Sequence, residues 1–490
     1  MIKPVRRDET WHRPARTGYP DPVKMLGYVW PRVEELRGTP REEWPRPEAL
    51  AEALVELARY FEEAGWDDLA LRTHHEVLEF RRELGDTEQL RRVLTALRDN
   101  LMRHERYEEA LAVTQEELPL AQRLAVPGRY STEIANVARY WITNLLGKLG
   151  RHAEAAENAR EAIEEVREQQ EPIEHASPPG YRLAHAHSEY ARRLRTIGEY
   201  ERAAGAMAEA ASFWRRHDAP LNCHTAFDEL SLLQLRLGRF EDARASSTEA
   251  VEALRHNTDW TSRDNLAAAL HNHGNRLHDL GLFPEAVETA RESVDRYREL
   301  LAEAERPALV MKMRLRVSLA LVSLGSRLHD VGRLDESLAA SDEAVTLATG
   351  DRDLARAWTN RASLLITLGS HAAAAQAAAK GIDLYPTEDG KAMARNTFAL
   401  ASAHAGDLDA ALEASLQAVA HYREQHAEDP YEYAYLLADA LTDHAVIRGL
   451  RSEPAQDAIT ESLALNEELA ARHPARYQRE LDRARSVACG

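Results

Sequence analysis

Two stretches of the chain, HNHGNRLHDLGLFPEAVETARESV at residues 271–294 and SLGSRLHDVGRLDESLAASDEAV at residues 323–345, show the pattern that decides the fold. Both contain RLHD-x-G, and both then open a second segment with acidic and small residues. Looser copies of the same plan recur between residues 62 and 463. The chain is therefore predicted to repeat one unit, made of a helix, a tight turn and a second helix.

Each part of this unit has a physical role. The turn glycine suits the left-handed or tight conformation that ends the first helix. The acidic residues beside it favour the positive N-terminal end of the second helix. Small residues such as Ala286, Ala290 and Ser293 share one helical face and let two helices approach closely. A single helix pair cannot bury its apolar face alone, so neighbouring pairs are expected to stack.

The pattern resembles the tetratricopeptide repeat over roughly residues 50–470. The small residue that begins the second helix recurs at intervals of 37 to 51 residues, against 34 in the family, which resembles its long-repeat bacterial members. Strand signals are nearly absent. We therefore expect an all-α superhelical solenoid of about nine or ten stacked helix hairpins. One frame of the family pattern is formed by Leu270, Gly274, Leu277, Gly281, Ala286 and Ala290, and another by Trp358, Ala362, Leu365, Gly369, Ala374 and Ala378.

Two regions interrupt the repeats. Residues 1–48 are rich in proline and contain Trp11, Trp30 and Trp44, so they are expected to form either a cap on the first hairpin or an arm that contacts a partner. The cap is favoured, because exposing three tryptophans to water is costly. Residues 168–187 are expected to form an insertion or hinge. The predicted organisation is an N-terminal cap or arm at 1–48, a solenoid at 49–470, and a closing helix and tail at 471–490.

Composition limits the classes of partner. The 490 residues include 62 basic and 81 acidic side chains, a net charge of −19, which disfavours direct binding to nucleic acid or to anionic lipid. Cys223 and Cys489 form no metal-binding or redox motif and are expected to be free thiols. The sequence shows neither a secretory signal nor a membrane span, so a cytoplasmic location is expected. Abundant arginine and scarce lysine suggest a GC-rich bacterial genome.

The resemblance implies that the first helix of each hairpin lines a concave groove. His271, Asn275 and His278 lie at positions i, i+4 and i+7 and so share one polar face. Asparagine suits a groove that binds peptide, because its amide both donates and accepts hydrogen bonds. A solvated face without a ligand is the alternative. The predicted groove residues are Glu189, Arg192, Asp228, Glu229, His271, Asn272, Asn275, His278, Ser326, His329, Arg356, Asn360, Ser363, Arg395 and Asn396.

Catalytic and metal-binding motifs are absent from the sequence. There is no G-x-S-x-G elbow, no phosphate-binding glycine loop and no H-E-x-x-H zinc motif. His278 and His329 occupy equivalent positions in adjacent repeats, and a shared ion between them is a minor alternative. We therefore expect no catalytic residues, no metal and no cofactor.

The predicted function is a non-enzymatic scaffold or adaptor that binds a peptide or protein segment in the groove. The first alternative is a peptide- or ligand-gated bacterial regulator that acts through protein contact. The second is an enzyme with a histidine/carboxylate site in the groove. The sequence does not determine the oligomeric state.

Overall fold

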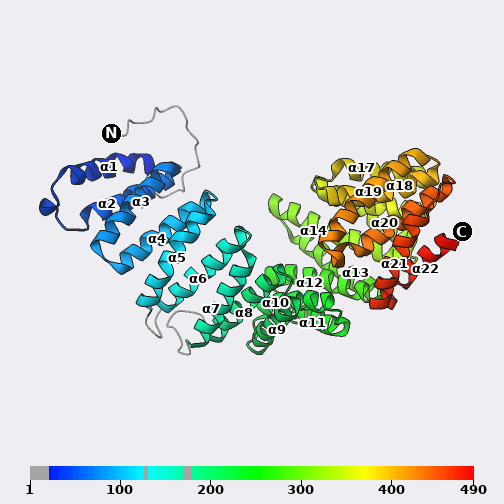
Figure 1. Ribbon diagram of the computed structural model, residues 1–490, viewed down its shortest axis with the longest axis horizontal. Coiled ribbons are helices and arrows are strands. Elements are labelled where there is room, and N and C mark those ends of the chain that lie inside the picture. The colour runs from blue at the N-terminus through cyan, green and yellow to red at the C-terminus, as the bar shows by residue number, and fades with distance from the viewer. Residues whose placement is uncertain (1–20, 126–130, 169–178, 490) are drawn as a thin grey trace. The chain divides into compact units, whose positions relative to one another are not determined.

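The computed structural model describes residues 21–125, 131–168 and 179–489, and throughout these ranges the chain forms helices and no strands (Figure 1). This confirms the all-α prediction. The helices up to residue 216 are α1 (Pro22–Gly38), the short 3-10 helix η1 (Arg41–Glu43), α2 (Ala49–Glu63), α3 (Asp67–Leu84), α4 (Thr87–Arg103), α5 (Tyr107–Leu124), α6 (Ser131–Lys148), α7 (His152–Glu168), α8 (Pro179–Thr196) and α9 (Tyr200–Arg216).

The remaining helices continue the same alternation to the end of the described chain. They are α10 (Pro220–Arg236), α11 (Phe240–Glu252), α12 (Trp260–Asp279), α13 (Phe283–Glu303), α14 (Pro307–Asp330), α15 (Leu334–Leu347), α16 (Asp351–Thr367), α17 (His371–Leu384), α18 (Glu388–Ala405), α19 (Leu408–Glu428), α20 (Pro430–Leu450), α21 (Gln456–Arg472) and α22 (Pro474–Cys489). In the described chain, α2 to α21 form ten successive hairpins, in agreement with the predicted nine or ten.

The chain divides into two compact units, unit 1 at Met1–Phe213 and unit 2 at Trp214–Gly490. The sequence pattern, which runs through both, does not reveal this division. Residues 169–178, half of the predicted insertion or hinge at 168–187, lie outside the described residues. Residues 179–187 instead form the first turns of α8, so the prediction was wrong there. No helix of the described chain is long and apolar enough to cross a lipid bilayer.

The small residues predicted to open each second helix are all buried, with an exposed fraction of 1% or less. They hold the two helices of a hairpin close together. At Gly274 of α12, for example, an added Cβ would lie 3.6 Å from the carbonyl oxygen of Ala286 in α13. Bulky side chains between the helices would force them apart. The nine residues are Ala70, Ala110, Ala155, Ala203, Ala243, Ala286, Ser337, Ala374 and Ala411.

Every hairpin turn contains one residue with positive φ. Eight of the ten turns place a glycine there, such as Gly369 with φ +72°. The other two use Glu105, with φ 56°, and Ser452, with φ 59°. Left-handed backbone costs a residue with a Cβ about 1–2 kcal/mol, so these two turns are strained.

Replacing Ser452 by glycine is expected to raise the unfolding free energy of unit 2 by about 0.5–1 kcal/mol, because the strain is relieved at a smaller entropic cost. The matched change Gly369→Ala introduces the same strain into a turn with open space around it and is expected to destabilise by a similar amount. Urea denaturation followed by circular dichroism compares the midpoints. Equal midpoints for both variants would show that turn conformation is not under strain.

The start of unit 1 is covered by aromatic side chains from residues 21–48. Trp30 packs edge-on against Phe61 of α2 with ring centroids 5.4 Å apart, and Trp44 lies 5.5 Å from Phe80 of α3. The Trp44 indole N–H also donates to the carbonyl oxygen of Leu36. These contacts favour a cap for this segment, whereas Trp11 lies outside the described residues.

Unit 2 is curved, and its even-numbered helices form the inner wall. From α10 to α22, each even-numbered helix contacts the next even-numbered one, whereas no comparable contact joins successive odd-numbered helices in the described part of the unit. In a bent stack of hairpins, the helices on the inside of the bend are the ones crowded together. The first helix of each hairpin therefore lies on the concave side.

Candidate functional site

The inner wall of unit 2 is polar and cross-linked from repeat to repeat. The Asn272 side-chain amide of α12 donates to a carboxylate oxygen of Asp228 in α10 at 2.9 Å. One helix further along, the Arg327 guanidinium of α14 donates to the side-chain oxygen of Asn275. Each contact uses one half of an asparagine amide. Both amides thus hold neighbouring repeats together and keep one polar atom for another partner.

The two histidines that were considered as a shared ion site have separate partners. His278 Nε2 lies 2.8 Å from Asp330 Oδ2, and His329 Nε2 lies 2.7 Å from the Thr367 hydroxyl in α16. Among the described residues, no group of three histidine, cysteine or carboxylate side chains is placed to hold a metal ion. The two rings therefore join α12, α14 and α16 through hydrogen bonds.

Asparagines further along the wall have contrasting surroundings. The Asn396 amide of α18 donates to Asp443 at 2.9 Å and to Asp439 at 3.4 Å, both in α20, while its own oxygen is buried with no hydrogen-bond partner. Asn360 instead turns its oxygen toward the outer helix α15, where Ser341 donates to it at 3.1 Å. Asn360 thus lies partly between the helices of the stack, away from the open face.

The other predicted residues are spread more widely. Ser326 and Ser363 are exposed on α14 and α16, and Arg395 pairs with Glu388 of its own helix at 3.0 Å. Glu229 is half-buried on α10. Glu189 and Arg192 lie on α8 of unit 1, where Glu189 pairs with Arg193. Among the predicted residues of unit 2, Asp228 and Asn272 are joined directly by a hydrogen bond, while His271, Asn272, Asn275 and His278 share helix α12.

Sequence reasoning missed two arginines on the inner face of α14. Arg316 lies two helical turns before Ser323 of α14 and Arg327 lies one turn after it, so the three share one face of the helix. Extending the same periodicity backward and forward would have found both. Arg327 is the arginine of the second RLHD motif, which was used above only as a marker of the repeat. Its side chain is only 4% exposed.

His271 is half-buried beside a group of cations. Its pKa is lowered to about 4, chiefly by burial and then by Arg327, Arg316 and Arg356, since each of these charges disfavours a charged imidazole. Burial also lowers the pKa of Arg327 to about 10, despite the opposing charges of Asp279 and Asp330. At neutral pH, His271 is therefore an uncharged imidazole among charged guanidinium groups.

This arrangement predicts a pH-dependent stability. Because the pKa of His271 is about 4 in the folded chain and about 6.5 when unfolded, the unfolded chain binds the proton first as the pH falls. Stability is therefore complete above pH 6.5 and declines toward pH 4, by up to about 3 kcal/mol for this group. His271→Gln removes that loss. Thermal melts at pH 7.0, 5.5 and 4.5 should show that the melting temperature of the variant rises relative to that of the wild type as the pH falls. A constant difference between the two melting temperatures would contradict the lowered pKa of His271.

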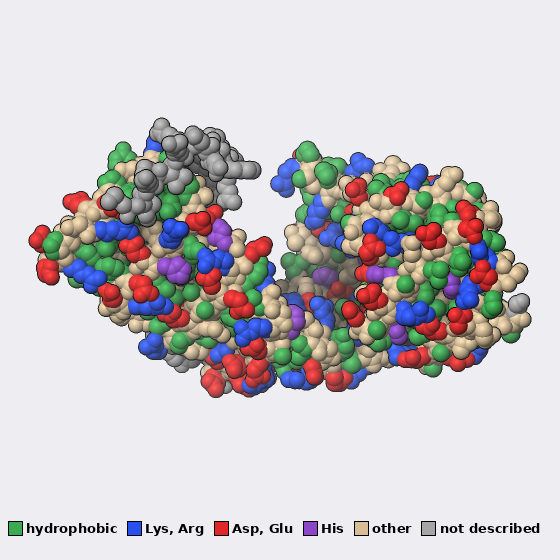
Figure 2. All heavy atoms as spheres, turned by 45° about the horizontal axis from the view of Figure 1, so that its top comes forward, with side chains coloured by type: hydrophobic (Ala, Val, Ile, Leu, Met, Phe, Trp, Pro, Cys, Tyr) green, Lys and Arg blue, Asp and Glu red, His purple; other side chains and the backbone are tan. Residues whose placement is uncertain are grey.

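The exterior of unit 2 has a different electrostatic character. On and just after the outer helices, arginines form ion pairs with glutamates of the next hairpin, including Arg255–Glu292 at 3.1 Å and Arg298–Glu343 at 2.6 Å. Figure 2 shows acidic and basic side chains mixed over the visible surface. Such exposed pairs contribute roughly 0–1 kcal/mol each. The outer face is thus largely neutralised by pairing.

The curvature brings the end of unit 2 back against its beginning. Arg236 of α10 lies 3.4 Å from Asp429 and 3.2 Å from Glu432, and its guanidinium lies 4.7 Å from the centre of the Tyr431 ring. The Phe240 and His473 rings meet edge-on with centroids 4.2 Å apart. We call this contact the seam.

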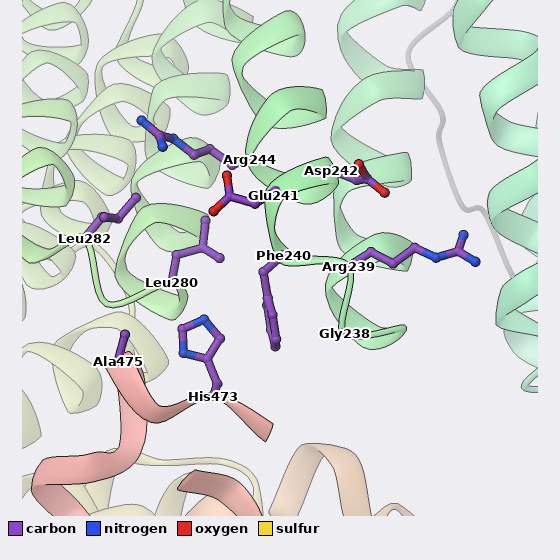
Figure 3. Close-up of a pocket in the computed structure, with 10 residues that line it drawn as sticks. All are labelled: Gly238, Arg239, Phe240, Glu241, Asp242, Arg244, Leu280, Leu282, His473 and Ala475. Carbon is purple, nitrogen blue, oxygen red and sulfur yellow. The ribbon is translucent and has the colours of Figure 1, made fainter. Parts of the chain in front are cut away.

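A cleft of about 540 Å³ opens along the seam (Figure 3). Its walls come from the α10–α11 turn, the α12–α13 turn and the start of α22, and Figure 3 shows Phe240 and His473 facing each other across it. Glycine is required at position 281 for two reasons. Its φ of +73° is unfavourable for residues with a Cβ, and an added Cβ would come within 2.6 Å of the Ala475 carbonyl oxygen. The seam therefore depends on close backbone contact as well as on ion pairs.

Reversing one charge is expected to loosen the seam. Arg236→Glu faces Asp429 and Glu432 with a like charge, so hydrogen–deuterium exchange in α20 and α22 should become faster. Glu432→Arg alone should act in the same direction, whereas the double variant with both changes should restore slow exchange. Independent, additive effects of the two changes would contradict a direct contact across the seam.

Comparison with known proteins agrees with this architecture. The sequence model of the tetratricopeptide repeat family matches residues 355–388, which span α16 and α17. Comparison with curated protein sequences gives no match. The apo form of RapI is structurally similar, with a TM-score of 0.52 and 11% sequence identity, covering 82% of this chain and 99% of that chain. The fold and the family match together identify the chain as a repeat protein of the tetratricopeptide type.

Two further solved structures are more distant. The apo quorum sensor NprR from B. thuringiensis has a TM-score of 0.46 and 14% identity, covering 79% of this chain and 99% of its own. A signal transduction ATPase with numerous domains and a tetratricopeptide repeat sensor, from Pyrococcus horikoshii, has a TM-score of 0.48 and 12% identity, covering 96% of this chain and 65% of its own. At these identities the likeness concerns the fold alone.

Proposed function

We propose that unit 2 binds an extended peptide or protein segment along its inner wall and acts as a non-enzymatic adaptor. The main support for the proposal is a set of asparagine side chains on that wall. Among the described residues, each uses either its N–H group or its oxygen within the wall and leaves the other without a hydrogen-bond partner. Asn272 keeps its oxygen, Asn275 keeps its N–H groups, and Asn396 has a buried oxygen without a partner. Asn272 and Asn275 lie on α12 and Asn396 lies on α18, and both helices are first helices of the curved stack.

An extended main chain suits such a wall. Each of its peptide groups offers one N–H donor and one carbonyl acceptor, and an asparagine amide matches either. The inter-repeat bonds already fix the orientation of the amides, which lowers the entropic cost of binding.

The thiol chemistry of the unit supports a role without covalent catalysis. Cys223 is buried on α10, and burial raises the pKa of its thiol to about 11. The thiol is therefore protonated at neutral pH and is a poor nucleophile. This observation favours binding over the enzymatic alternative, although it concerns one residue of the wall's first helix.

The seam favours a gated regulator as the second candidate. Its ion pairs involve partly exposed side chains, and such pairs contribute roughly 0–1 kcal/mol each. A segment that enters the groove only when α20 and α22 move away from α10 would couple binding to opening. In that case Arg236→Glu would tighten binding, whereas a simple adaptor would bind equally well with the seam open or closed.

Selection from displayed random nine-residue peptides tests the proposal. Wild-type protein should enrich binders, and the double variant Asn272→Ala/Asn275→Ala should bind them about tenfold more weakly, since two hydrogen bonds of about 0.5–1.5 kcal/mol each are lost. Gln376→Ala, which removes an exposed amide from the outer helix α17, serves as the matched control. Failure of the wild type to enrich any peptide, or equal affinity for both variants, would refute the proposal.

A further inference from the structure

His473 holds the start of α22 at the seam. It directly precedes Pro474, the first residue of α22, and its Nδ1 atom accepts a hydrogen bond from the backbone N–H of Arg476 at 3.2 Å. His473 therefore acts as the N-cap of the helix. Burial lowers the pKa of His473, so its imidazole is uncharged at neutral pH. Because Nδ1 is an acceptor, the single proton of the uncharged ring lies on Nε2.

The Nε2–H group of His473 points into the cleft along the seam. In Figure 3, one ring nitrogen of His473 faces Ala475 and the other faces the side of the cleft on which Leu280 lies. Within the described residues, this second nitrogen has no hydrogen-bond partner, although the residue is only 9% exposed. So enclosed a donor has little room for water, and an acceptor that enters the cleft would complete its hydrogen bonding. The cleft thus offers a fixed donor to a ligand.

Apolar side chains surround this donor. The Phe240 ring meets the His473 ring edge-on, and Leu280 and Leu282 of the α12–α13 turn line the neighbouring wall (Figure 3). The cleft has a volume of about 540 Å³, which lies within the range of roughly 300–1,000 Å³ that is typical of small-molecule sites. Such sites combine an apolar lining with a few fixed polar groups. The cleft has both features.

The charged side chains of the cleft balance one another. Glu241 and Asp242 are acidic, Arg239 and Arg244 are basic, and together they give the lining no net charge. The two carboxylates lie in the first turn of α11, where they favour its positive N-terminal end. Figure 3 shows the guanidinium groups of Arg239 and Arg244 extending away from His473. A molecule beside His473 therefore meets apolar surface and one neutral donor, which favours an uncharged ligand.

We propose that the cleft at the seam binds a small uncharged molecule that has an apolar body and an oxygen acceptor, such as a carboxamide or a ketone. The oxygen accepts a hydrogen bond from His473 Nε2, and the apolar body packs on Phe240, Leu280 and Leu282. This site is separate from the inner wall, so the inference goes beyond the proposed function and does not depend on it. Because the cleft walls come from both ends of unit 2, the bound molecule also fastens the seam.

Three probes that share a phenyl ring and differ in charge test the proposed ligand class. Benzamide is uncharged, benzoate is an anion and benzylamine is a cation at neutral pH. In saturation-transfer NMR titrations of the full-length wild type, benzamide should bind at least about fivefold more tightly than either ion, because an apolar lining does not replace the hydration of a charge. Tighter or equal binding of either ion, or no transfer to any of the three probes, would overturn the proposal.

A matched pair of variants places the binding at the seam. His473→Asn removes the donor from the cleft but keeps an N-cap for α22, and it should weaken benzamide binding about threefold to tenfold, the loss expected for one hydrogen bond. His404→Asn removes an exposed imidazole that stacks on His371 away from the cleft, and it should leave the affinity unchanged. Saturating benzamide should also slow hydrogen–deuterium exchange in α22 of the wild type. Equal affinities of the two variants, or unchanged exchange in α22, would contradict a ligand bound across the seam.

Discussion

The close approach of the two helices in each hairpin is the constraint on which the rest of the structure depends. It requires a small residue at the start of every second helix, and residues such as Ala243, Ala286 and Ala374 are completely buried there. Because only a methyl group is buried at this point, the backbones of the two helices nearly touch. Each hairpin is therefore thin and closely packed. Stacking such hairpins buries their remaining apolar faces. The stack then has one inner and one outer series of helices.

The two series have opposite electrostatic roles in unit 2. The outer helices neutralise their arginines with glutamates of neighbouring hairpins, which suits a surface that only has to remain in water. The inner helices instead carry asparagine amides that use only their donor or only their acceptor within the wall, and half-buried arginines lie on the same helices. Pairing within the wall fixes side-chain orientation, while the amide atoms that stay unused suit the N–H and carbonyl groups of an extended main chain.

Much of the fold could be predicted from the sequence, because the repeat is local. The turn glycines, the buried alanines and the polar column of His271, Asn275 and His278 all follow from spacing along one hairpin. The partners of these side chains were less predictable, because they belong to neighbouring repeats: Asn272 bonds to a residue 44 positions away. Asn360 has the residue type and spacing predicted for the groove, yet its oxygen faces α15. A small tilt of a helix is enough to decide which neighbouring element a side chain contacts.

The seam was the feature of unit 2 that was least predictable from the sequence. The contact between Arg236 and Asp429 joins residues 193 positions apart, and it exists only because small rotations between hairpins add up along unit 2. No local pattern encodes that sum. The stacking of the hairpins also determines the division of the chain into two units and the positions of Arg316 and Arg327. For the two arginines, however, the periodicity of α14 already contained a signal.

Photo-cross-linking tests most directly the central claim that the inner wall of unit 2 is the binding surface. A selected peptide carrying a photoreactive residue would be irradiated with the full-length chain, and the adducts mapped by mass spectrometry. We predict adducts on the even-numbered helices, concentrated on α12, α14 and α16. Adducts concentrated on the odd-numbered helices, or distributed over both series alike, would contradict it.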